Sequence, residues 1–124
     1  MNIQFIDTKV THLNLAGVSQ ENLEDEDEFK FSFTPAFSEL ELNEFLIIFN
    51  VSLKIEDEFF LMVEYVARFS VDGDIDEVFK ESNFVKMNAP AIAYPFLRAY
   101  IGNLTLSSGF SPIVLPTINF TKFL

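Results

Sequence analysis

The chain has 124 residues, enough for one domain with a single hydrophobic core. It carries 19 acidic and 8 basic residues, a formal net charge of −11. This balance argues against nucleic acid as a partner and disfavours anionic membrane surfaces, because contacts to both rely on clustered lysine and arginine. Apolar residues nevertheless make up 49% of the chain, so we expect charge repulsion to keep exposed apolar surface in solution.

The sequence predicts a cytoplasmic protein that forms one domain over residues 1–124. It has no cysteine, so no disulfide ties it to an oxidising compartment. Its first ten residues, MNIQFIDTKV, lack the basic start and apolar run of a signal peptide. The apolar runs are too short to span a bilayer, and we expect no membrane insertion.

The first two segments differ sharply in composition. Residues 3–15 alternate loosely between apolar and polar side chains, with Phe5, Leu13 and Leu15 on one face, and predict a first strand. Residues 17–28, GVSQENLEDEDE, are dominated by acids. Such a charge run is typical of a solvated connection rather than of a binding site.

Three further segments alternate strictly and predict strands. Residues 29–37 place phenylalanine at four odd positions. Residues 45–55 and 59–71 carry apolar residues at every odd position. The short acidic turn from Glu56 to Glu58 between the last two segments predicts an antiparallel hairpin.

Two helical patterns follow the strands. The first covers residues 76–82, after a turn at Gly73. The second covers residues 89–106, where Ala93, Leu97 and Ile101 share one stripe. Pro95 is expected near the start of this helix, where a proline costs little. The helix should end before Gly109, and residues 111–120 should continue as extended chain held by prolines.

The predicted fold class is α+β: a four-stranded antiparallel sheet followed by helices packed on one face. The opposite face of this sheet also carries apolar residues among polar ones. They are Leu46, Ile48, Phe60, Met62 and Val66. A sheet that is apolar on both faces has more surface to bury than one helix can cover. This pattern favours self-association or an exposed apolar binding surface.

No arrangement of residues predicts catalysis, a metal site or a cofactor. The single histidine, His12, has no partners at the spacing of a metal centre or of a nucleophile and base. Asp72, Asp74 and Asp76 are spaced like the start of a calcium loop, but the glycine and the final glutamate of such a loop are missing. We therefore expect a charged turn there, and a protein that is not an enzyme.

Residues 94–120, YPFLRAYIGNLTLSSGFSPIVLPTINF, resemble the C-terminal region of the SecB protein-export chaperone family. In that family an aromatic–Pro–aromatic-x-Arg helix start leads to a glycine, a Phe-Pro-type pair and a closing Asn-Phe after a proline. The order of strands, hairpin and helix upstream is also similar. The matching residues are Tyr94, Pro95, Phe96, Arg98, Gly109, Phe110, Pro112, Pro116, Ile118, Asn119 and Phe120.

The resemblance implies an ATP-independent holdase that assembles as a dimer of dimers and binds unfolded polypeptides in apolar grooves between sheet and helix. Its clients would be preproteins or, as for solitary SecB-like chaperones, an antitoxin. The implied groove residues come from the second strand, the long helix and the extended segment. They are Phe29, Phe31, Phe33, Phe96, Tyr100, Ile113 and Leu115.

Export itself is less well supported by the resemblance. Exporting members dock on the translocase motor SecA through acids on the outer sheet face and the first strand. Glu64 is the candidate acid of the fourth strand, but the first-strand positions fall at Val10 and Asn14. We therefore expect weak docking at most. The alternative to a holdase is a non-enzymatic assembly module with one dedicated folded partner.

Overall fold

Four strands form one antiparallel sheet in the computed structural model, which describes residues 2–123. They are β1 (Ile3–Gly17), β2 (Phe29–Phe37), β3 (Glu44–Ile55) and β4 (Phe59–Val71). Their order across the sheet is β1-β4-β3-β2, so β1 and β2 are the two edge strands. The predicted α+β class, with the sheet first and the helices after it, is confirmed.

The hairpin of β3 and β4 supplies the core. Its turn contains Glu56 and Asp57, both with positive φ, as predicted for a tight connection. The odd residues of both strands are buried, from Phe45 to Ile55 and from Leu61 to Val71, and they face the helix. The alternation seen in the sequence therefore separates a core face from an open face.

The loose alternation of β1 has a structural cause. The strand pairs with β4 over its whole length, but the register shifts between Phe5 and Asp7 and again between Val10 and His12. Each β-bulge moves the side-chain alternation by one residue, and the two together restore it. Phe5, Leu13 and Leu15 therefore share the helix face as predicted. Between the bulges the even-numbered residues face the helix instead, and Val10 is one of them.

The helical elements differ from the prediction in detail. The acidic connection contains a short helix, α1 (Gln20–Leu23), because Ser19 caps it and Leu23 is buried, although most of the acids remain exposed. The helix predicted over residues 76–82 is shorter, α2 (Glu77–Lys80), and Asp76 caps it by accepting a hydrogen bond from Phe79 N–H at 2.8 Å. One of the three aspartates of the apparent calcium loop thus has a structural role.

The long helix, α3 (Ala89–Ser107), follows directly on a π-helical turn, η1 (Phe84–Asn88). Helical structure therefore begins earlier than the sequence suggests, and Pro95 lies inside α3 rather than near its start. Pro90 takes the position at the beginning where the missing N–H costs nothing. Because Pro95 has no N–H, the carbonyl of Ala91 lacks its usual helical donor. Both residues are exposed, so water can hydrogen-bond that carbonyl.

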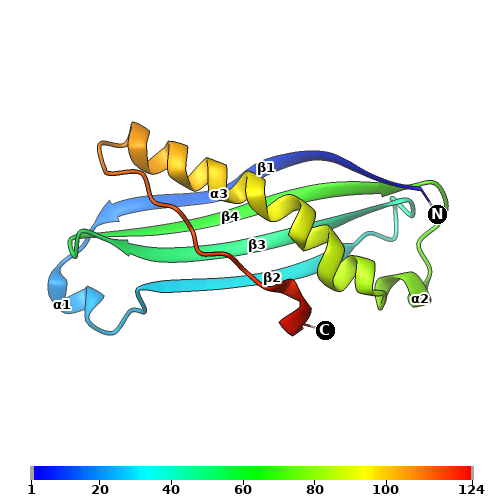
Figure 1. Ribbon diagram of the computed structural model, residues 1–124, viewed down its shortest axis with the longest axis horizontal. Coiled ribbons are helices and arrows are strands. Elements are labelled where there is room, and N and C mark those ends of the chain that lie inside the picture. Colours follow the sequence, from blue (N-terminus) through cyan, green and yellow to red (C-terminus); the bar gives the residue numbers. More distant parts are fainter. Residues whose placement is uncertain (1, 124) are drawn as a thin grey trace.

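The molecule has two layers (Figure 1). Helix α3 crosses one face of the sheet diagonally, and the segment after Gly109 runs back across the same face toward β2, where it ends in a short 3-10 turn, η2 (Phe120–Phe123). No segment of residues 2–123 covers the opposite face of the sheet. No helix among residues 2–123 is long and apolar enough to cross a membrane.

Candidate functional site

Two side-chain hydrogen bonds attach the extended segment 110–119 to helix α3, in addition to the backbone bond from Phe110 N–H to Thr105 O at 3.0 Å. The Thr105 hydroxyl accepts from Ile113 N–H at 3.0 Å, and the Tyr94 hydroxyl donates to Pro116 O at 2.6 Å. Burial raises the pKa of the Tyr94 phenol, which therefore stays protonated and able to donate near neutral pH. Beyond Phe110 the segment is thus held at two points by side chains, and most of its backbone is left without a backbone partner among the described residues.

Replacing Thr105 with valine is expected to lower the free energy of unfolding by about 1–3 kcal/mol. The substitution keeps the shape of this fully buried side chain but leaves Ile113 N–H without its acceptor. Denaturant titration measures the loss. Thr117→Val is the matched control, because Thr117 lies exposed in the same extended segment. Equal stabilities of the two variants would contradict an anchoring role for Thr105.

A row of aromatic side chains follows β2 on the helix side of the sheet. Phe29 stacks on Phe31 with ring centroids 6.5 Å apart, and Phe31 is followed by Phe33 at 6.3 Å. All three rings are half-buried. Tyr94 from α3 meets Phe31 edge-on at 5.4 Å, so helix and edge strand share one aromatic cluster.

The end of the described chain covers part of this row. Phe120 packs against Phe31 and Phe33, with ring centroids at 6.2 and 5.5 Å, and Phe123 lies 5.0 Å from Phe33. Phe123 remains 48% exposed. The free end of the row is therefore at Phe29.

Phe29 opens onto a cleft of about 220 Å³ between β2 and the extended segment. Ile113, Val114 and Leu115 line its other side, and Leu115 is almost completely buried. The structure thus brings together five of the predicted groove residues. They are Phe29, Phe31, Phe33, Ile113 and Leu115.

The two predicted helix residues lie elsewhere. Phe96 meets Phe5 of β1 edge-on at 4.8 Å and is 48% exposed, and Tyr100 stacks on Tyr65 of β4 at 5.5 Å. Among the described residues no aromatic contact joins either side chain to the β2 row. The single groove expected from the resemblance is therefore divided among three aromatic groups: the β2 row, the pair of Phe5 and Phe96, and the pair of Tyr65 and Tyr100.

Residues that complete the β2 cluster were not among the predicted site residues. Tyr94 and Phe120 belong to the motif quoted above, so the sequence contained a signal for both. It did not show that they would meet Phe31, because that contact depends on the diagonal crossing of α3 and on the path of the extended segment. Phe123 carried no pattern at all.

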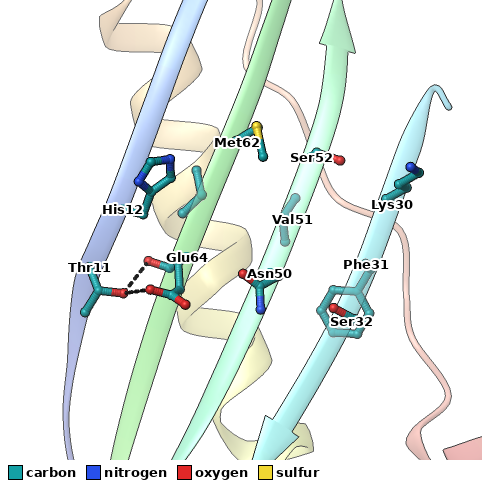
Figure 2. Close-up of a pocket in the computed structure, with 11 residues that line it drawn as sticks. Thr11, His12, Lys30, Phe31, Ser32, Asn50, Val51, Ser52, Met62 and Glu64 are labelled. Atoms are coloured by element: carbon teal, nitrogen blue, oxygen red, sulfur yellow. Dashed lines mark hydrogen bonds between the residues drawn. The ribbon is translucent and has the colours of Figure 1, made fainter. Parts of the chain in front are cut away.

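The open face holds the other predicted site residue, Glu64. Its carboxylate accepts a hydrogen bond from Thr11 Oγ1 at 2.7 Å (Figure 2). Around it lies a shallow basin of about 790 Å³ lined by side chains from all four strands. They include His12, Lys30, Ser32, Asn50, Ser52 and Met62. Of the two first-strand positions, Asn14 pairs with Met62 on this face, whereas Val10 pairs with Tyr65 and faces the helix.

The charge of the open face differs from that of the whole molecule. Strand register places four cations there, Lys9, Lys30, Lys54 and Arg68, against three acids, Asp7, Glu44 and Glu64, a balance of 4 − 3 = +1. Arg68 pairs with Asp7 at 2.8 Å and with Glu44 at 3.3 Å, and its guanidinium holds the pKa of the Asp7 carboxyl below the usual value. Most of the 19 acids therefore lie outside this face.

An antiparallel four-stranded sheet, a long helix across one face and an aromatic extended segment together define a SecB-like fold. The family model described as "Preprotein translocase subunit SecB" matches residues 11–124. The chain belongs to the SecB family.

Relatives in sequence support this assignment. The chain is 35% identical over 65 residues to the protein-export protein SecB of Anaplasma phagocytophilum, covering 51% of this chain and 40% of that protein. It is 35% identical over 75 residues to SecB of Roseobacter denitrificans, covering 57% and 44%. An uncharacterized protein of Methanocaldococcus jannaschii is 30% identical over 89 residues, covering 67% and 56%. The matches thus span about half the length of these relatives.

Two solved structures share the fold. One is the SecB-like chaperone Rv1957 of Mycobacterium tuberculosis in complex with a ChAD peptide from the HigA1 antitoxin Rv1956. Its TM-score is 0.70 at 16% identity, covering 94% of this chain and 91% of that one. The other is a protein of unknown function from Streptococcus agalactiae, with a TM-score of 0.66 at 14% identity and coverages of 94% and 98%.

Proposed function

We propose that this protein is an ATP-independent holdase of the cytoplasm that binds unfolded polypeptide segments on the β2 aromatic cluster and needs no cofactor. The half-buried row Phe29–Phe31–Phe33, which opens onto a cleft beside an extended segment, is the observation that carries the proposal. Aromatic rings accept side chains of many shapes, which a binder of varied unfolded clients requires. Membership of the SecB family supports the same function.

The proposal is tested by suppression of aggregation. Several unrelated proteins are diluted from denaturant with and without the chain, in the absence of ATP, and light scattering is followed. We expect suppression for most of them at near-stoichiometric ratios. Suppression of none, together with recovery of a single folded protein partner from native lysate, would instead establish a dedicated assembly module.

Clients of two classes suit this surface: preproteins and an antitoxin segment. The structural relative Rv1957 holds a peptide of an antitoxin, which favours the second class. The test compares binding of unfolded preproteins with binding of antitoxin-derived peptides, and the tighter set identifies the physiological client.

The holdase is further proposed to work as a homo-oligomer, a tetramer built as a dimer of dimers. The outward side of α3 is uncharged and exposes Ile92, Phe96 and Leu106. Arg98 is the sole charged residue of this helix, and it is half-buried. An apolar helix face of this kind suits packing against a second copy.

Docking on the translocase motor SecA is expected to be weak. The strands of the open face carry a net charge of +1 at the place where exporting members present acids. The carboxylate of Glu64 is also already engaged by a hydrogen bond from Thr11. The net charge of −11 still attracts a basic tail. Without contacts at fixed positions this attraction does not align the two proteins, and salt screens it. Titration calorimetry against the basic tail of SecA at about 0.15 M salt should show little heat. Tight, stoichiometric, salt-resistant binding would place the protein in export.

A further inference from the structure

The backbone groups of β2 alternate between its partner strand and the free edge. Lys54 N–H donates to Glu28 O at 3.1 Å, so Glu28 and Lys54 form a hydrogen-bonded pair of the antiparallel ladder. From Phe29 to Phe37 the pairing with β3 continues without irregularity. The even residues of β2 therefore bond β3, and the odd residues direct N–H and C=O toward the free edge. The odd residues are Phe29, Phe31, Phe33, Pro35 and Phe37.

The same residues thus present aromatic side chains and unpaired backbone. Within residues 2–123 the N–H and C=O groups of Phe29, Phe31 and Phe33 have no backbone partner. Each residue offers one donor and one acceptor, so three residues offer six groups to an incoming strand. Their side chains form the row described above. In Figure 1 β2 is the outer strand, between α1 at one end and η2 near the other.

Pro35 limits this edge. Pro35 is one of the odd residues of β2, whose backbone groups point to the free edge. The N–H that a proline lacks is therefore absent from the free edge, and the ladder with β3 is unaffected. A strand that pairs along Phe29 to Phe33 finds no donor at the next outward position. The run of acids before Phe29 bounds the other end. The usable edge is therefore the stretch from Phe29 to Phe33.

The other edge of the sheet offers no comparable stretch near its middle. The two bulges of β1, at Phe5/Asp7 and Val10/His12, divide its outward backbone groups into short sections. Bulges on edge strands interrupt the regular spacing that an incoming strand requires. Of the two edges, β2 is the regular one.

We propose that the protein captures clients by strand addition: an extended client segment pairs with the backbone of Phe29, Phe31 and Phe33, and Pro35 ends the pairing. This inference rests on the proposed holdase function and specifies the form in which the client binds. Backbone pairing is independent of sequence, so it gives affinity for any extended segment, while the aromatic row selects side chains.

The geometry also defines the preferred client sequence. Client residues opposite Phe29, Phe31 and Phe33 direct their side chains to the helix side of the sheet, over the aromatic row. The residues between them face the open side, beside Lys30, Ser32 and Thr34. The preferred segment alternates apolar and polar residues and lacks proline at the positions that pair.

The test uses the unmodified protein and a short uncharged peptide that alternates phenylalanine with threonine, in three forms. One form is unmodified, one is N-methylated on the phenylalanines and one on the threonines. N-methylation removes backbone donors and leaves side chains intact. Only one alternate set of peptide N–H groups can face β2, so we expect one methylated form to lose about tenfold or more in affinity while the other stays close to the unmodified peptide.

A loss of affinity on N-methylation of the phenylalanines indicates antiparallel addition of the peptide to β2. A loss of affinity on N-methylation of the threonines indicates parallel addition. Equal affinities of the two methylated forms would overturn strand addition while leaving apolar capture in place. No binding of the unmodified peptide would overturn the proposed function together with this inference. Fluorescence anisotropy of labelled peptides measures all three affinities.

Amide hydrogen exchange gives a second readout on the protein itself. In the free protein the amides of Phe29, Phe31 and Phe33 should exchange faster than those of Lys30, Ser32 and Thr34, which bond β3. The unmodified peptide should slow the first set and leave the second unchanged. Slowing of both sets alike, or of neither, would contradict pairing at this edge.

Discussion

A Phe31→Ser variant is expected to bind unfolded clients about 30-fold more weakly than the native chain, the effect of losing roughly 2 kcal/mol at an aromatic hot spot. Phe31 lies at the centre of the β2 cluster, where it contacts Phe29, Phe33, Tyr94 and Phe120. Its ring is half-buried, so truncation should cost less than the ~3–5 kcal/mol of stability typical of a fully buried phenylalanine. Peptide titration and denaturant unfolding measure the two effects separately.

Phe79→Ser is the matched control for stability. Phe79 is also half-buried and packs on Phe45 and Phe84 at the end of the sheet near α2, away from the β2 row. It should lose stability and keep its affinity for clients. If Phe31→Ser and Phe79→Ser lose affinity equally, the loss reflects unfolding rather than a binding site.

Phe96→Ser separates the β2 cluster from the pair of Phe5 and Phe96. Because Phe96 packs on Phe5 of the opposite edge strand, the single variant should retain client binding. The double variant Phe31→Ser/Phe96→Ser should then bind clients no more weakly than Phe31→Ser alone, and should still fold. A further large loss on adding Phe96→Ser would show that both groups belong to one binding surface. Wholesale unfolding of the double variant would show that these residues are core.

The double variant Phe96→Asp/Leu106→Asp is expected to dissociate the proposed oligomer and to raise its dissociation constant about 100-fold or more. The reason is that apposed like charges at an interface cost several kcal/mol. Leu106 is exposed on the outward side of α3, and Phe96 is 48% exposed there beside its contact with Phe5, so the substitutions should leave the fold of one chain intact. Light scattering should then report a mass close to the 14.2 kDa of one chain.

Val78→Asp provides the control for added charge. Val78 is an exposed apolar residue of the short helix α2, outside the proposed interface. It should leave the mass unchanged. A native chain that is already monomeric at micromolar concentration would contradict the oligomer itself, and an oligomer that survives both aspartates would move the interface away from α3.

The strands were predictable because their alternation has a direct physical origin. A strand that buries one face must alternate, and β3 and β4 do so at nearly every odd residue. The bounds of α3 agree with the predicted helix over residues 89–106 to within one residue, but its local features were not predictable in the same way. The π-helical turn before it and the interior position of Pro95 depend on solvent exposure of that side of the helix, which local patterning does not report.

The candidate site was predictable only in part for a related reason. Alternation assigns Phe29, Phe31 and Phe33 to one face, and the resemblance adds Ile113 and Leu115. Whether Phe96 joins them depends on the angle at which α3 crosses the sheet. That angle is set by packing of the whole helix on β3 and β4, and no spacing within the helix specifies it.

Strand β1 has 15 residues and pairs along its whole length with the 13 residues of β4. The surplus of two is taken up by the two bulges, near Ile6 and near Thr11. Deleting either of these residues would therefore shorten the chain without moving any β1 side chain to the other face. Deletion of both would straighten the edge and make it as regular as that of β2. We expect such a shortened protein to expose a regular, unpaired strand at each edge of its sheet, an arrangement that favours edge-to-edge association of chains. The two bulge residues therefore limit pairing at the β1 edge.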